Sequence, residues 1–223
     1  MSVQDLRIKF FSNQLALDGI LHLPETPAPP LVIGSHGLEG SKDSAKQRLL
    51  SRILPDAGIA YFRFDHRGCG KSQGSFVEDT SIELRARDII DALQHLLSLG
   101  VTSRNIALFG SSMGGAACIR AWGDICKLDI QLRGLVICAA PLKSITIKNI
   151  PTQANGRRPA LPLSFFARNL LFDLTDQARE LSNILIFHGE ADDVVPANNA
   201  EDIYDHALEP KQLIIQPGGD HQM

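Results

Sequence analysis

The residue of this chain best suited to covalent chemistry is Ser112, in the stretch GSSMGG from Gly110 to Gly115. The apolar run before it predicts a strand over 105–110, and the run after it predicts a helix over 113–122. Gly110, Ser112 and Gly114 form the pattern G-x-S-x-G, which places a serine on a sharp, strained turn between strand and helix. Glycines suit such a bend because side chains there would collide. The pattern predicts a nucleophilic hydroxyl held above the end of a sheet.

A serine hydroxyl is a weak nucleophile without a base, and the chain has seven histidines to supply one. In this strand–turn–helix setting the acid follows the serine along the chain, and the histidine follows the acid. That order favours His221, which comes after the apolar run QLIIQP and the loop GGD. His188 precedes the candidate acids and His206 falls in a helical segment, so both fit the order less well.

The candidate acids lie in the stretch HGEADDVVP, which supplies Glu190, Asp192 and Asp193. The spacing favours Asp192, and Asp193 is the main rival. The carboxylate would accept the second imidazole N–H and fix the tautomer of His221. Because imidazole ordinarily titrates near pH 6.5, we expect kcat/KM to rise with pH through roughly 6 to 7.5.

An oxyanion hole needs two N–H groups aimed at the charge that develops on the attacked carbonyl. The amide of Met113, directly after the nucleophile, is the first candidate, and the amide of Leu38, in the loop after LVIGSHG, is the second. We expect Gly37 and Glu39 to lie against the substrate. His36 is expected to be a structural hydrogen bonder and not a base.

The elements that must position these residues alternate along the chain. Apolar runs predict eight strands, at residues 6–11, 17–24, 31–37, 59–65, 105–110, 132–140, 183–189 and 212–217. Helical spacing predicts helices over 43–57, 81–99 and 113–122 and another after Pro196, the second beginning with a capping box, TSIE, closed by Glu83. Continuous apolar strands separated by helices predict an α/β fold, a mostly parallel sheet with helices on both faces and an antiparallel pair at one edge. Ligands bind such sheets at the carboxyl ends of the strands, which is where the candidate residues fall.

Length and composition set further bounds. The 223 residues suit a single domain over 1–223, and a net charge of −3 gives no sign of a nucleic-acid-binding surface. The N-terminal stretch has no leader-like apolar region, and no uncharged run approaches the roughly 20 residues that cross a bilayer, so we expect no membrane contact and a cytoplasmic location. The cysteines have neither disulfide nor metal-site spacing, so reduced thiols are expected. They are Cys69, Cys118, Cys126 and Cys138.

These motifs together resemble the α/β-hydrolase superfamily over nearly the whole chain. SHGLEG is similar to its oxyanion loop, FRFDHRGCGKSQG to its D-x-R-G-x-G-x-S segment, GSSMGG to its nucleophile elbow, HGEADDVVP to its acid loop and GGDH to its histidine loop. The pattern is most similar to compact serine aminopeptidase-like, prolyl-oligopeptidase-like and cinnamoyl-esterase-like members. The resemblance implies an eight-stranded hydrolase fold and hydrolysis of a small ester, or of an amide or thioester, without metal or organic cofactor.

Two features depart from that family. The segment between the sixth and seventh strands, 142–183, is a short insertion that predicts a small cap and an open site. The chain also reaches its last residue, Met223, two positions after His221, where relatives usually continue into a helix. With Gly218 and Gly219 just before it, the His221 loop is expected to be poorly anchored and the activity low, unless a neighbouring subunit covers it.

Three further hypotheses stay open. GCGKS resembles the end of a P-loop, but Asp65 stands where that motif needs glycine, so a structural turn held by Asp65 and Arg67 is the better interpretation. The chain could instead be a non-catalytic binding protein on a hydrolase scaffold. The cap has no acidic residue from Pro141 to Phe172 and could favour substrates with an apolar acyl group and an anionic end, although a solvated loop with a helix packed on the core is the simpler interpretation. Its basic residues are Lys143, Lys148, Arg157, Arg158 and Arg168.

Overall fold

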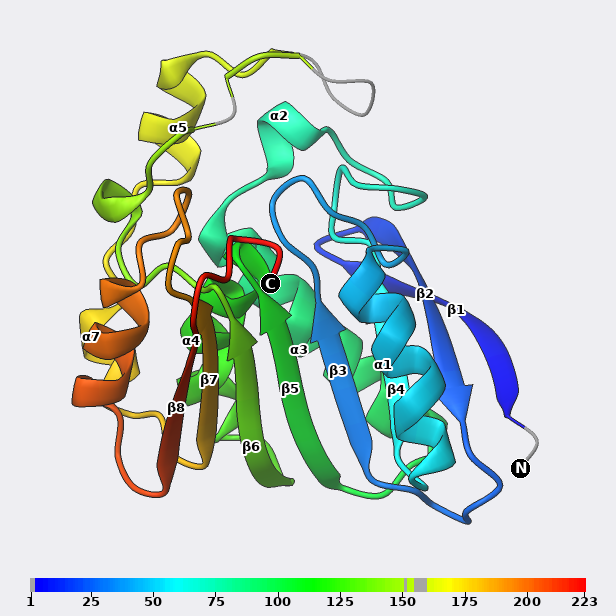
Figure 1. Cartoon of the computed structure of the whole chain (residues 1–223). Coiled ribbons are helices and arrows are strands. Elements are labelled where there is room, and N and C mark those ends of the chain that lie inside the picture. Colours follow the sequence, from blue (N-terminus) through cyan, green and yellow to red (C-terminus); the bar gives the residue numbers. More distant parts are fainter. Residues whose placement is uncertain (1–2, 151, 155–159) are drawn as a thin grey trace.

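The computed structural model describes residues 3–150, 152–154 and 160–223 and contains an eight-stranded sheet (Figure 1). The strand order across the sheet is β1-β2-β4-β3-β5-β6-β7-β8. The strands are β1 Gln4–Ser12, β2 Leu15–Leu23, β3 Leu31–Ser35, β4 Ala60–Phe64, β5 Asn105–Ser111, β6 Gln131–Cys138, β7 Ile184–Gly189 and β8 Lys211–Gln216. The predicted α/β class is confirmed.

The direction of the strands also agrees with the sequence. Strands β3 to β8 pair in parallel, whereas β2 runs antiparallel to both β1 and β4. The carboxyl ends of the parallel strands therefore meet at the upper edge of the sheet in Figure 1, below α5 and α2, and the C-terminus lies near the same edge.

Helices lie on both faces of the sheet. Helix α1 packs on one face, near β2 and β4, and α3, α4, α6 and α7 pack on the other (Figure 1). The helices are α1 Ala45–Asp56, α2 Phe76–Asp79, α3 Ile82–Leu99, α4 Met113–Ile125, α5 Leu163–Asn169, α6 Thr175–Ala178 and α7 Asn198–His206, with a 3-10 turn at Ser144–Thr146. The main core lies between the sheet and α3 and α4, and it includes Ile33, Leu108, Ile137, Ile186, Ile89, Leu93 and Ile119.

Helix α1 is present as predicted, but its buried face is polar. Gln47 and Ser51 face the sheet, while Leu49 and Ile53 are about half exposed, at 51% and 50%. Gln47 accepts a hydrogen bond from the Tyr61 hydroxyl at 2.6 Å, in the space that Gly34 leaves. The apolar spacing of α1 therefore identified a helix but not the side that packs.

The sheet face under α1 is only partly covered. Gly34 faces α1, and the parallel registers carry the same face across Phe109, Val136 and Leu185. Val136 and Leu185 are half-buried, and a shallow hollow of about 460 Å³ lies over this region. Among the helices of the described residues, α1 is the one that packs on this face.

Helix α3 begins one residue later than the predicted capping box requires. Ser81 is the N-cap and accepts from the Leu84 amide at 3.1 Å. Glu83 does not return to the cap, because its carboxylate pairs with Arg120 on α4 at 2.7 Å. Salt-bridge formation between two helices replaces the local hydrogen bond there.

The insertion between β6 and β7 rises above the carboxyl edge of the sheet. It carries α5 and α6, and Phe165 of α5 stacks on Phe76 of α2 with ring centroids 6.0 Å apart. Asn169 also donates to the Val77 carbonyl at 2.9 Å. Figure 1 shows α5 beside α2, above the carboxyl edge of the sheet.

No helix in the described part of the chain is both long and apolar enough to cross a membrane.

Candidate active site

Ser112 lies at the turn between β5 and α4, with φ 52° and ψ −126°. L-residues rarely adopt this conformation, and it persists only where the surroundings impose it. Both flanking glycines are required by close backbone contacts. A Cβ on Gly110 would lie 2.5 Å from the Gly115 Cα, and one on Gly114 would lie 2.2 Å from the Ser35 carbonyl oxygen. The G-x-S-x-G pattern therefore reflects a turn too tight for side chains on either side of the serine.

The structure brings Ser112, His221 and Asp192 together from three separate loops. The His221 Nε2 lies 3.1 Å from the Ser112 Oγ, and the His221 Nδ1 lies 2.7 Å from the Asp192 Oδ2. A carboxylate only accepts hydrogen bonds, so Nδ1 carries the proton and Nε2 is left to accept from the serine hydroxyl. This is the tautomer that a general base needs.

Asp192 is held as a carboxylate by donors on both of its oxygens. Its Oδ1 accepts from the amides of Val194 and Val195 at 2.9 and 2.8 Å, and its Oδ2 receives His221 and, at 3.3 Å, the buried His188. Burial raises the pKa of Asp192, but hydrogen bonds from the two histidines and the two amides outweigh it and hold that pKa well below its usual range. Asp192 is therefore ionised at neutral pH.

Asp193, the rival acid, lies elsewhere. Its side chain and its carbonyl both accept from the Asn149 side chain, at 3.3 and 2.9 Å, at the base of the insertion. The third acid, Glu190, accepts from the Gly218 amide at 2.9 Å. Neither carboxylate is bonded to His221 in the structure.

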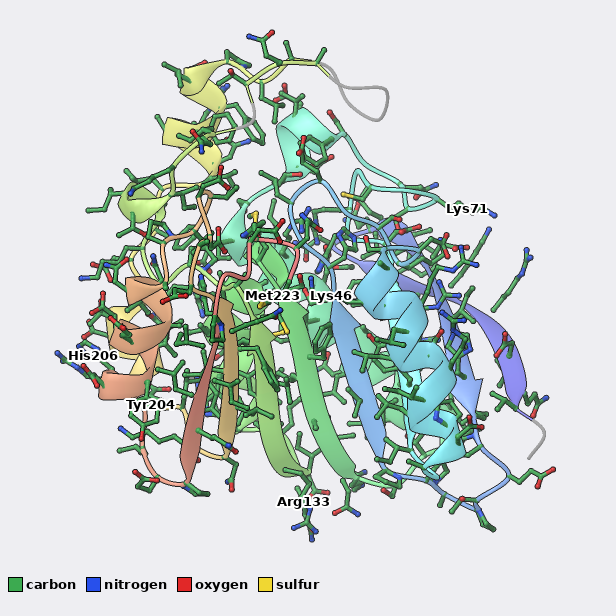
Figure 2. All side chains as sticks on the ribbon, viewed as in Figure 1. Lys46, Lys71, Arg133, Tyr204, His206 and Met223 are labelled. Carbon is green, nitrogen blue, oxygen red and sulfur yellow. The ribbon has the colours of Figure 1, made fainter. Side chains whose placement is uncertain are left out.

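The loop that carries His221 is anchored, so the expectation that it lacks fixing contacts is wrong. The Ala191 amide donates to the Gly219 carbonyl at 2.8 Å, which ties this loop to the acid loop. Lys46 of α1 donates to the Gln222 carbonyl at 2.5 Å, and Figure 2 shows Lys46 beside Met223. The physical reason is backbone bonding to a neighbouring loop, which needs no apolar surface from the following residues.

The loop after β3 lies directly against the serine. A Cβ on Gly37 would lie 3.4 Å from the Ser112 Cβ, at ordinary van der Waals distance, so the backbone of this loop passes close to the serine. Leu38 follows it, and Glu39 is exposed on the same loop. Among the described residues, neither the Leu38 amide nor the Met113 amide has a hydrogen-bond acceptor. Both amides are thus free to bind an oxyanion.

His36 and His66 form part of a buried polar network behind this loop. His36 Nδ1 donates to the Gly37 carbonyl at 2.8 Å, and its Nε2 accepts from the His66 amide at 3.1 Å. Asp88 of α3 accepts from His66 Nδ1 at 3.1 Å and from Arg67 Nη2 at 2.6 Å. Burial lowers the pKa of His66 to about 4 and holds that of His36 well below 6.5, so both rings are neutral at pH 7.

The GCGKS segment is a turn. The Lys71 amide donates to the Asp65 carboxylate at 2.9 Å, and the next helix, α2, begins at Phe76. Lys71 projects outward at the edge of the molecule (Figure 2). Asp65 also pairs with the buried Lys42, so the segment fixes loops near the site and does not form a phosphate cradle.

The sequence did not predict the roles of two residues near the site, His188 and Arg85. His188 is predicted only as a poorly fitting base, but its Nε2 donates to the Val195 carbonyl at 2.8 Å and lies 3.3 Å from the Asp192 carboxylate. Arg85 lies on the buried face of α3, and its signal was a charge at helical spacing between Ile82 and Ile89, where an apolar residue is expected.

The cap residues are partly placed. Lys143 pairs with Asp173 at 3.5 Å, whereas Lys148 and Arg168 are exposed. Arg157 and Arg158 lie outside the described residues. Within the described part of the chain, no three metal-binding side chains gather at one point, and all four cysteines are unpaired.

Comparison with known proteins identifies the family of this chain. A family model described as "Serine aminopeptidase, S33" matches residues 26–170. The protein YfhR of Escherichia coli (strain K12) is 30% identical over 203 residues, which span 89% of this chain and 65% of YfhR. The chain thus spans slightly less than two thirds of the length of YfhR. The mouse mitochondrial palmitoyl-protein thioesterase ABHD10 is 25% identical over 231 residues, 96% of this chain and 76% of ABHD10.

Solved structures show the same fold at lower identity. Est1E from Butyrivibrio proteoclasticus, with ferulic acid bound, gives a TM-score of 0.80 at 22% identity and covers 96% of this chain and 90% of its own. The α/β hydrolase GrgF from Penicillium sp. sh18 gives 0.79 at 18% identity, with 99% and 91% covered. The match of the family model to more than half of the residues, on this fold, shows that the chain belongs to the serine aminopeptidase S33 family of the α/β-hydrolase superfamily.

Proposed function

We propose that this protein is a serine hydrolase that cleaves carboxylic esters of small substrates through an acyl-enzyme on Ser112. The observation that carries the proposal is the hydrogen-bond chain from the Ser112 hydroxyl through His221 to Asp192, at 3.1 and 2.7 Å. These distances lie within the reach that proton transfer requires. The strained backbone at Ser112 also supports it, because strain of this kind is concentrated at functional sites.

The chemistry proceeds in two halves. His221 Nε2 takes the hydroxyl proton as the Ser112 Oγ bonds to the acyl carbon, and the carbonyl π electrons move onto the oxygen. The amides of Leu38 and Met113 bind this oxyanion. As the intermediate collapses, the bond to the leaving group breaks and His221 delivers the proton to that group. Water then attacks the acyl-enzyme by the same steps and releases the acid.

The kind of acyl substrate is the finer part of the proposal. Est1E was solved with a carboxylic acid, ferulic acid, and the mouse relative is named as a thioesterase. The family description names an aminopeptidase, which supports amide hydrolysis as the runner-up. We favour esters, with Gly37 and Glu39 beside the bound acyl group.

The cap favours an apolar acyl chain. Its exposed side chains include Leu163 and Leu171, each 68% exposed, on the insertion that rises above the carboxyl edge of the sheet. Lys148 and Arg168 add exposed positive charge on the same insertion. If these charges attract an anionic end of the substrate, kcat/KM for an anionic ester falls more steeply with ionic strength than for a neutral ester of equal length. Equal salt responses would remove the anionic preference and leave the apolar one.

Labelling with an alkyl fluorophosphonate tests the catalytic proposal directly. We expect one adduct on Ser112 in the native chain and none in Ser112→Ala. A panel of p-nitrophenyl esters, aminoacyl arylamides and acyl-CoA thioesters then ranks the acyl bonds. A folded native chain that neither reacts with the phosphonate nor hydrolyses the panel would instead support a non-catalytic binding protein.

The four unpaired cysteines support a reducing, cytoplasmic setting for this reaction.

A further inference from the structure

Arg85 is the largest fully buried side chain of the described residues, and it reaches the loop that carries the Leu38 amide. Its Nη1 donates to the carbonyls of His36 and Gly37 at 3.1 and 3.2 Å, and its Nη2 donates to the carbonyl of Leu38 at 3.2 Å. One planar guanidinium thus binds three consecutive carbonyls. Because an arginine fork has fixed geometry, the three peptide planes are oriented relative to one another.

The orientation of these planes fixes the direction of the amides. In a trans peptide the C=O and the following N–H point in opposite directions. A Gly37 carbonyl held on Arg85 therefore turns the Leu38 N–H to the opposite side of the loop. The Gly37 carbonyl also accepts from the Gly40 amide at 3.1 Å and from His36 at 2.8 Å, so its direction is fixed by three donors.

The charge of Arg85 is not neutralised by a carboxylate. No acid in the described residues lies within ion-pair distance of it, and its Nε has no acceptor. The nearest candidate, Asp88, is one turn along α3 and is occupied by Arg67 and His66. The Cys69 Sγ, 3.6 Å from Nη2, completes its surroundings. A buried cation bound to peptide oxygens, with no carboxylate in ion-pair contact, draws electron density toward itself and makes the opposite N–H groups stronger donors.

From these contacts we propose that Arg85 is a positioning residue for ester hydrolysis, which orients and polarises the Leu38 amide of the oxyanion hole. This inference rests on the proposed function, since it assigns Arg85 a part in the same reaction. Arg85 touches neither substrate nor Ser112. Its effect reaches the oxyanion through the Gly37–Leu38 peptide, so it is exerted mainly in the transition state, where the negative charge develops.

The test compares three variants of the full chain with p-nitrophenyl butyrate as substrate. Arg85→Met removes the charge and the fork, and Arg85→Lys keeps the charge without the fork. Arg63→Met is the matched control, because Arg63 is also buried and also donates to a loop carbonyl, that of Lys42, at 2.7 Å, but away from residues 36–38. The unfolding midpoint in urea is measured for each.

We expect Arg85→Met to lower kcat by about 10- to 100-fold with KM changed less than about 3-fold, since loss of one oxyanion donor costs about 100- to 1,000-fold and here the donor is weakened and not deleted. Arg85→Lys should recover part of this loss. Arg63→Met should keep kcat within about 3-fold, whatever its stability.

An alkyl trifluoromethyl ketone gives a readout that a purely structural role would not move. The Ser112 Oγ adds to the ketone carbon, the carbonyl oxygen becomes an oxyanion, and His221 holds the proton. The inhibition constant should rise in Arg85→Met by the same factor as kcat falls, and the pKa of the adduct oxyanion, followed by ¹⁹F NMR, should rise with it.

The outcomes separate this inference from the proposed function. A native chain that neither hydrolyses the ester nor reacts with fluorophosphonate at Ser112 would overturn both. A reactive native chain with kcat and inhibition constant unchanged in folded Arg85→Met would overturn the Arg85 assignment alone, as would an equal loss of kcat in Arg63→Met. If Arg85→Met does not fold, Arg85→Lys decides, and native kcat in that variant would contradict the assignment.

Discussion

Ser112 combines the reactive hydroxyl with a backbone conformation that favours glycine, at φ 52°. Ser112→Ala and Ser112→Gly should both lose turnover, because neither supplies an oxygen nucleophile. Ser112→Gly should be more stable than Ser112→Ala by about 1 kcal/mol, since glycine relieves the strain of positive φ. Ester hydrolysis and urea unfolding measure the two effects. Ser111→Ala is the control and should keep most activity. The reverse ranking of Ser111→Ala and Ser112→Ala would mean that the nucleophile is misassigned.

The two neighbouring aspartates should differ sharply. Asp192→Asn removes the acceptor that fixes the His221 tautomer. By analogy with the same substitution in the serine-protease triad, it should cost up to about four orders of magnitude in kcat. Asp193→Asn should cost little, because Asp193 is bonded to Asn149 and not to His221. Similar losses in both variants would contradict the assignment of the acid.

Since the pKa of Asp192 lies well below its usual range, a loss of kcat/KM from pH 7.5 to 6 would reflect the titration of an imidazole and not of this carboxyl.

At the scale of elements, the buried network between the loop after β4 and helix α3 should make stability depend on pH. Burial lowers the pKa of His66 from 6.5 to about 4. Between these values the unfolded chain binds a proton that the folded chain does not. The free energy of unfolding should therefore fall by up to about 1.4 kcal/mol per pH unit as pH decreases through this window, and His66 should have no effect above it.

Urea unfolding at pH 7, 6 and 5 measures this slope. The pKa values of His36 and His22 are also lowered, by burial first, so they add to it in the same direction. His66→Gln cannot take up the proton and should give a shallower slope than the native chain. An unfolding free energy that stays constant from pH 7 to pH 5 would mean that these histidines are not held neutral.

At the scale of the whole molecule, the two faces of the sheet are covered unequally. Ile186 of β7 points into the core and is 1% exposed, while its neighbour Leu185 points to the face of α1 and is half-buried. Ile186→Ala should cost about 2–5 kcal/mol of stability. Leu185→Ala should cost about 1–2 kcal/mol, because less apolar surface is removed from water there. Urea unfolding compares them, and equal losses would mean that the second face is covered in solution.

The chain order of the elements and the positions of the candidate residues could be predicted from the sequence. Apolar runs and helical spacing are local signals, so they identified the strands, the main helices and the antiparallel edge. Gly110 and Gly114 marked the turn at Ser112 because close backbone contact excludes side chains locally. The order of serine, acid and histidine followed from the same strand–turn–helix setting.

Tertiary structure decided what depends on contacts between distant segments. Periodicity could not show that α1 buries Gln47, because that choice depends on Tyr61 and Gly34 from two strands. Spacing favoured Asp192 over Asp193, but it could not show the partners of these two residues, His221 and Asn149, which are set by how the loops fold together. Nor could it connect Arg85 of α3 to the carbonyls of residues 36–38, almost fifty positions earlier in the chain. A sequence shows which groups are available, and only the folded backbone determines which of them lie within hydrogen-bond distance.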